Sequence, residues 1–203
     1  ELYTEEAYVM FQRLQFKNLL SRFEVKAPVN KLEDSFKKIT KKSEAEKIFK
    51  KAASCDTVGI SFYKDTTNVL PLFVNEAGIT GLGLSFGQED IYVLTTDEGM
   101  SIEYLLDEIV DLSQNVKALA LFQGKKALEY IPKVRKESMF DGIIAAYLLN
   151  PLKNDYDFMD VAREQLDILI DDKMEELHKS FYEAYAAFAS KAILENKLVE
   201  AKM

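Results

Sequence analysis

The chain has 203 residues, of which 48% are hydrophobic and 30% charged, and its formal net charge is −8 at pH 7. These values are ordinary for a globular domain, and no apolar run approaches the roughly 18 residues of a membrane span. The negative charge argues against a free-standing nucleic-acid binder, because such proteins gain affinity mainly from Lys and Arg on phosphates. One cysteine, Cys55, excludes an internal disulfide and suits a reducing compartment, so we expect a cytoplasmic protein.

The N-terminal part is predicted to be a helix followed by a linker. Residues 4–22 carry apolar side chains at near-helical spacing, with Thr4 as the predicted N-cap. Residues 24–42 are polar and rich in lysine, which is typical of a linker. The basic run over residues 31–51 indicates a solvated surface in preference to a DNA-facing patch. Because the chain begins at Glu1 and not at Met, we expect it to be cut from a longer protein.

The pattern then changes to strands. Ser43 followed three residues later by Glu46 predicts a capping box for a helix over 44–54. β-branched and aromatic residues, separated by turn residues, predict an antiparallel meander. The predicted strands cover residues 57–63, 69–74, 79–86 and 91–95, and a later one covers 117–122.

Helices dominate the rest of the chain. Ser101 is the predicted N-cap of a helix over 101–113, and Asp141 caps another over 142–149. The remaining predicted helices cover residues 125–131, 157–170 and 172–198. A meander followed by an α-β-α unit and a helical block predicts an α/β layered domain. The single histidine, His178, lies in a charged helical stretch, which indicates a solvated side chain and not a metal ligand.

Residues 140–151 read Phe-Asp-Gly-Ile-Ile-Ala-Ala-Tyr-Leu-Leu-Asn-Pro, and they resemble the "FD…AAYLL-P" helix of the 3′–5′ exonuclease domain of bacterial DNA polymerase I, a family A polymerase. Weaker similarities follow the order of the family at residues 1–23, 83–86 and 155–162. The resemblance implies a ribonuclease H-like three-layer fold, with a mixed sheet flanked by helices. It also implies that residues 1–42 are the helix and linker from a preceding nuclease region, and that 43–203 are the exonuclease-like domain.

Active members of this family hold two divalent metal ions with four carboxylates, since hard cations require oxygen ligands. At the matching positions this chain has mostly other residues. They are Ser61 and Tyr63 for the first motif (Asp65 after a shift of register), Gln123 and Gly124 for the second, and Tyr185 and Ala189 for the third. The resemblance therefore implies a degenerate site with no catalytic residue, no metal ligand and no cofactor.

This pattern predicts a vestigial, inactive exonuclease-like domain that supports DNA replication and repair synthesis by its parent polymerase. Its expected partners are the polymerase domain of the same chain and, through the parent enzyme, DNA, which the fragment alone binds weakly or not at all; no membrane partner is expected. Two alternatives stay open. One is an active metal-dependent exonuclease that uses displaced carboxylates, Asp65 with Asp157 or Asp160. The other is an acidic protein-interaction module.

Overall fold

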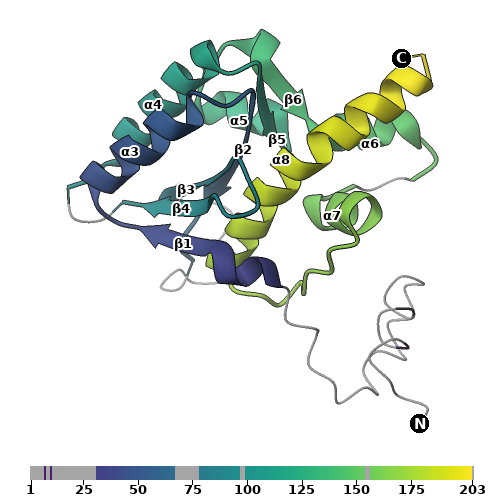
Figure 1. Cartoon of the computed structure of the whole chain (residues 1–203), viewed down its shortest axis with the longest axis horizontal. Coiled ribbons are helices and arrows are strands. Elements are labelled where there is room, and N and C mark those ends of the chain that lie inside the picture. Colours follow the sequence, from purple (N-terminus) through teal and green to yellow (C-terminus); the bar gives the residue numbers. More distant parts are fainter. Residues whose placement is uncertain are drawn as a thin grey trace.

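A computed structural model describes residues 7, 10, 31–66, 78–96, 99–153 and 156–202 of the chain (Figure 1). The core of these residues is a six-stranded mixed sheet in the order β1-β4-β3-β2-β5-β6. The strands are β1 (Phe36–Ile39), β2 (Thr57–Tyr63), β3 (Gly81–Ser85), β4 (Ile91–Thr95), β5 (Ala118–Leu121) and β6 (Met139–Asp141). The helices are η1 (Lys31–Ser35), α3 (Lys42–Ala52), α4 (Ile102–Asn115), α5 (Gly124–Tyr130), η3 (Lys136–Ser138), α6 (Gly142–Leu149), α7 (Phe158–Leu166) and α8 (Glu176–Glu200).

Both kinds of strand pairing occur in the sheet. Strands β2, β3 and β4 form the antiparallel meander that the sequence predicted, while β5 runs parallel to β2 and β6 runs parallel to β5. At the other edge, β1 runs parallel to β4. The predicted α/β class with a mixed, ribonuclease H-like sheet is therefore confirmed.

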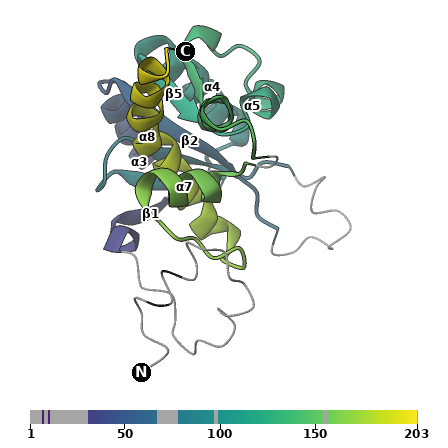
Figure 2. The same ribbon diagram turned by 90° about the vertical axis from the view of Figure 1, so that its right-hand side faces the viewer.

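The two faces of the sheet are covered by different helices (Figures 1 and 2). Successive residues of a strand point to opposite faces. In β2, Val58 and Ile60 join the core cluster that contains the apolar sides of α3 and α4. Gly59 and Ser61 face the long helix α8 on the opposite side.

Small residues let α8 lie close to the sheet. A Cβ atom at Gly59 would collide with the main-chain oxygen of Ala184 and the main-chain nitrogen of Phe188. Ala120 on β5 is fully buried in the cluster that holds α6, α7 and α8 together. The helix thus spans the middle of the sheet, and glycine is required where backbone meets backbone.

Two local predictions were wrong. The linker expected over 24–42 contains β1, which is a short edge strand in which Ile39 is buried while Lys37 and Lys38 face solvent. Lysines on a short strand are typical of a protected sheet edge and imitate a linker in sequence. The capping box is absent, because α3 begins at Lys42 and its N-cap, Lys41, makes no side-chain capping hydrogen bond. The sheet thus begins before the boundary predicted at residue 43.

Other helix ends follow the sequence more closely. Ser101 accepts a hydrogen bond from the Tyr104 amide and begins α4, as predicted. Helix α7 ends at Leu166, where Asp167 takes a left-handed conformation, and α8 begins only at Glu176. The helix predicted over 4–22, apart from residues 7 and 10, and the strand over 69–74 lie outside the described residues. None of the helices in the described part is both long and apolar enough to cross a bilayer.

Candidate functional site

A cavity of about 470 Å³ lies where the chain leaves β2 and β5. Because these two strands are parallel, their carboxyl ends open at the same edge of the sheet, which is the usual position of ligand sites in α/β folds. We call this cavity the recess. Its apolar wall consists of Phe62, Phe122, Ala127, Tyr130 and Phe158, and its polar lining consists of Lys64, Thr66, Gln123, Lys126, Glu176 and Glu183.

The recess holds one strongly perturbed carboxyl group. Burial and, to a smaller extent, the charge of Glu176 raise the pKa of Glu183 to about 8, with Lys126 partly opposing the shift. Glu176 and Glu183 are seven residues apart on α8, which places them on one side of the helix. At neutral pH the carboxyl of Glu183 is therefore largely protonated and uncharged.

A serine pair closes the space between β2 and α8. The hydroxyl of Ser61 donates to the main-chain oxygen of Ser180 at 2.8 Å, and the two hydroxyl oxygens are 2.7 Å apart. Both side chains are buried. Gly83 lies beside them on β3, where an added Cβ would collide with the Ser61 hydroxyl. This part of the strand–helix contact is filled by two small neutral groups.

The second predicted motif lies at the start of α5. Gln123 lines the recess and takes a left-handed backbone conformation, with φ of 58°, that non-glycine residues adopt uncommonly. The Gly124 amide donates to Asp141 Oδ2 at 2.6 Å, while Asp141 Oδ1 accepts from the amides of Ile143 and Ile144. The Asp141 carboxylate therefore joins the starts of α5 and α6. Its predicted capping role is confirmed, and its bond to α5 was not predicted.

The two residues of the third predicted motif lie outside the recess and pack toward β4. Tyr185 belongs to a cluster with Ile91 and Val93 of β4, and Ala189 packs against the same cluster. Tyr63 of the first motif packs there too, and burial, together with the nearby carboxylate of Asp65, raises the pKa of Tyr63. Of the seven positions that the resemblance singled out, the structure brings Gln123 into the lining of the recess.

Sequence reasoning missed Glu183. An acidic residue stands alone in the apolar stretch 181–187, Phe-Tyr-Glu-Ala-Tyr-Ala-Ala, and such an exception on a buried helix is the signal that could have identified it. The side chains around Glu183 in the recess come from β2, α5 and α7, which no local pattern relates to one another.

The carboxylates considered for a displaced site have structural roles. Asp157 accepts from the Asp160 amide at 2.8 Å and caps α7. Burial opposes the charge of Asp160, but hydrogen bonds and charges from Lys153 and Arg163 outweigh it and lower the pKa of Asp160. The main-chain amide of Asp65 donates to Thr80 Oγ1 at 2.7 Å. None of these three residues lines the recess.

The donor set does not fit a pair of divalent cations. Two-metal catalysis requires several carboxylates around ions about 4 Å apart. The recess provides two carboxyl groups, one of them with a raised pKa, next to the ammonium groups of Lys64 and Lys126. Within the described ranges, no three His, Cys, Asp or Glu side chains gather in a way that could hold a metal ion.

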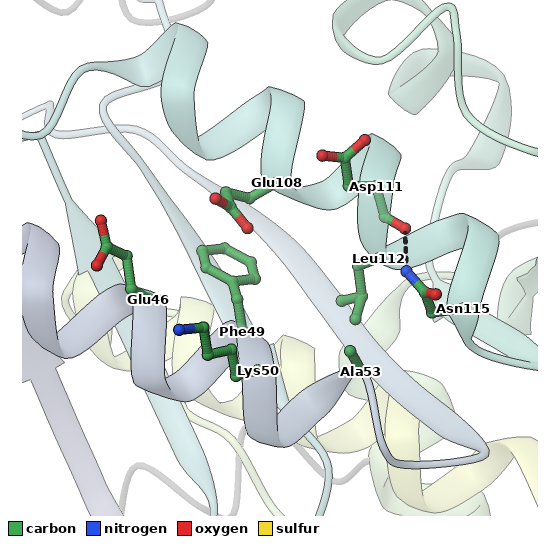
Figure 3. A pocket seen from close by; sticks show the side chains of 8 residues that line it. All are labelled: Glu46, Phe49, Lys50, Ala53, Glu108, Asp111, Leu112 and Asn115. Atoms are coloured by element: carbon green, nitrogen blue, oxygen red, sulfur yellow. Dashed lines mark hydrogen bonds between the residues drawn. The ribbon is translucent and has the colours of Figure 1, made fainter.

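A smaller cavity of about 160 Å³ lies on the other side of the sheet, between α3 and α4. Figure 3 shows Glu46, Glu108 and Asp111 around it, with Lys50 at its edge and Phe49 at its base. These acids belong to the outer sides of two amphipathic helices. The recess remains the candidate site, because strand ends converge there around the half-buried carboxyl of Glu183.

Comparisons with known proteins place the fold. No protein-family model and no curated protein sequence matches the chain. Among solved structures, it resembles the POL domain of Pol1 from M. smegmatis in complex with DNA primer-template and dNTP, with a TM-score of 0.62, 16% identity and coverage of 81% of this chain and 28% of that one.

Two smaller proteins match over most of their own length. The Nibbler EXO domain of Aedes aegypti gives a TM-score of 0.57 at 10% identity, covering 84% of this chain and 92% of that domain. NrnC of Brucella melitensis bound to pGG gives a TM-score of 0.59 at 15% sequence identity, and the match covers 82% of this chain and 82% of that one. These likenesses show the fold alone, which is a ribonuclease H-like arrangement of a mixed sheet and helices.

Proposed function

We propose that this chain is a vestigial, catalytically inactive 3′–5′ exonuclease-like domain of a bacterial DNA polymerase I. Its role is to pack against the polymerase domain of the same chain and to maintain the shape of an enzyme that performs replication and repair synthesis. The resemblance of residues 140–151 and the likeness to the POL domain of Pol1 support this assignment. Contact with DNA belongs to the parent enzyme, and the cytoplasm stays the expected compartment.

The serine pair is the observation that carries the proposal. The first-motif position Ser61 is hydrogen-bonded to Ser180 of α8, and Gly83 leaves no further space beside it. A metal ion between strand and helix needs both ionised oxygen ligands and several ångströms of room. Ser61 and Ser180 supply neither, which supports the loss of metal-dependent cleavage.

The alternative of an active nuclease with displaced carboxylates gains no support. Asp157 is used as a helix cap, and Asp160 is used in ion pairs with Lys153 and Arg163. Glu183 does line the recess, but its raised pKa and the neighbouring Lys126 oppose the binding of a cation there.

Metal binding provides the test. A ligand that binds only the folded state raises the melting temperature by mass action. We expect millimolar Mn²⁺ to leave the melting temperature of the purified chain unchanged relative to EDTA, when both are measured by scanning calorimetry. The Glu183→Gln variant is the matched control, because it removes the carboxyl from the recess and preserves its shape. A rise with Mn²⁺ in the native chain that disappears in this variant would overturn the proposal.

A further inference from the structure

Helix α6 is apolar on every side, yet part of it faces solvent. Its sequence, Gly-Ile-Ile-Ala-Ala-Tyr-Leu-Leu, contains no charged residue. Ile144, Tyr147 and Leu148 are 57%, 51% and 45% exposed. A helix that is apolar all round is normally buried on all sides. In the described structure α6 is covered on one side only, by α7 and α8.

The uncovered side forms one wall of a groove. A cavity of about 430 Å³ lies between α5, β6, α6 and the C-terminal part of α8, beside which α6 lies in Figure 1. We call it the α6 groove. Its apolar lining consists of Leu128, Met139, Phe140, Ile144, Ala145, Leu148 and Leu198. The carboxylate of Asp141, which also lines it, is already hydrogen-bonded to three main-chain amides.

Two lysines flank this apolar surface. Lys125 at the start of α5 and Lys136 in η3 line the groove, and both are exposed. Neither forms an ion pair with any acid in the described part of the chain, whereas Lys153 and Lys191 do. The groove thus carries two cationic side chains that no described acid neutralises, on a chain whose net charge is −8.

We propose that the α6 groove is a docking site for an acidic amphipathic helix of a partner domain. The apolar lining fits a stripe of branched side chains, which is the usual way a helix occupies a groove. The unpaired Lys125 and Lys136 fit carboxylates that flank such a stripe, because charge complementarity fixes the orientation and register of a partner. The inference goes beyond the proposed function and does not depend on the recess.

Two synthetic helical peptides test the proposal on the purified chain. Both carry the same leucine stripe; the flanking positions are Glu in one and Lys in the other. We expect the acidic peptide to bind and the basic peptide to bind at least about tenfold more weakly. The double variant Lys125→Glu/Lys136→Glu should reverse this preference. The matched control Lys38→Glu/Lys133→Glu carries the same charge change on exposed lysines outside the groove and should bind as the native chain does.

A Leu148→Ser variant tests the apolar part of the groove, and because Leu148 is 45% exposed, the variant should fold. The variant should bind the acidic peptide about tenfold more weakly, or weaker still, than the native chain does. Equal affinity for both peptides, or an equal effect of the two double variants, would overturn the proposal. Sedimentation gives a further contrary outcome: self-association of the chain that Leu148→Ser abolishes would identify a second copy as the occupant.

Discussion

Ser61 on β2 and Ser180 on α8 are 119 residues apart, and they form a buried pair in which the Ser61 hydroxyl donates to the Ser180 main-chain oxygen at 2.8 Å. Their hydroxyl oxygens are 2.7 Å apart, so the Ser180 hydroxyl can donate to that of Ser61. The pair occupies the contact between the central strand and the helix that crosses it. Under the proposed function, this neutral and closed contact is what distinguishes the chain from a metal-dependent exonuclease domain.

Replacing Ser61 with alanine tests the strength of this contact. The change removes both buried hydrogen bonds of the pair and leaves the Ser180 hydroxyl without its partner. We expect the free energy of unfolding in urea to fall by about 1–3 kcal/mol. Ser54→Ala is the matched control, because Ser54 makes a similar bond to the Lys51 main-chain oxygen at 2.7 Å but is exposed. Equal losses in the two variants would contradict a special role for the pair.

The close approach of α8 to β2 predicts a large effect at Gly59. An added methyl group would meet the main chain of Ala184 and Phe188, which cannot move without displacing the helix. Gly59→Ala should destabilise the fold by about 2–3 kcal/mol or prevent its formation. Gly78→Ala is the control, since no atom lies within 4 Å of the added Cβ. Thermal unfolding of both variants should show a clear loss for the first and little change for the second.

Glu183 predicts a pH dependence of stability. The pKa of Glu183 is raised from 4.5 to about 8 in the folded chain, so the folded state holds a proton that the unfolded state releases between these values. The stabilisation is complete below the unfolded pKa and is lost as pH rises through about 8. Glu183→Gln carries no titratable group at this site.

The difference in unfolding free energy between the native chain and Glu183→Gln isolates this effect. It should fall by roughly 2–4 kcal/mol from pH 5 to pH 9, at about 1.4 kcal/mol per pKa unit with a reduction for solvent at the mouth of the recess. Urea titrations across this range measure it. A difference that stays constant or rises with pH would show that the carboxyl is ionised in the folded state.

Asp141 serves two helices at once, which predicts a larger cost than that of an ordinary cap. Asp141→Ala loses hydrogen bonds to Gly124, Ile143 and Ile144 and should cost about 2–3 kcal/mol. Asp157→Ala, which removes the cap of α7 alone, should cost about 1 kcal/mol. Chemical denaturation of the two variants compares them, and equal costs would mean that the bond to α5 contributes little.

Local features of the fold were predictable, because they depend on a few neighbouring residues. Ser101 and Asp141 mark helix starts in sequence, and the β-branched and aromatic residues of β2 identify a strand. Edge strand β1 was not predictable, since Ile39 alone is buried and its lysines resemble a linker. Ser43 and Glu46 form no cap, because the helix begins one residue before Ser43.

The recess could not be predicted from the sequence, because the residues that line it are far apart in the chain. The resemblance pointed to Tyr185 and Ala189 on α8, but in the structure these side chains pack toward β4, and Glu183 lines the recess. Which side of a long buried helix faces a site is decided by packing, and α8 is apolar on more than one side. The serine pair joins residues far apart in the chain, so no local pattern contained it.

The central claim is the absence of metal-dependent cleavage, and an exonuclease assay tests it most directly. The purified chain is incubated with Mn²⁺ and single-stranded DNA labelled at its 5′ end, with EDTA and the variants Asp65→Asn and Glu183→Gln in parallel. The proposed function predicts that the DNA stays at full length in every reaction. Stepwise shortening from the 3′ end that requires Mn²⁺ and is lost in either variant would contradict it.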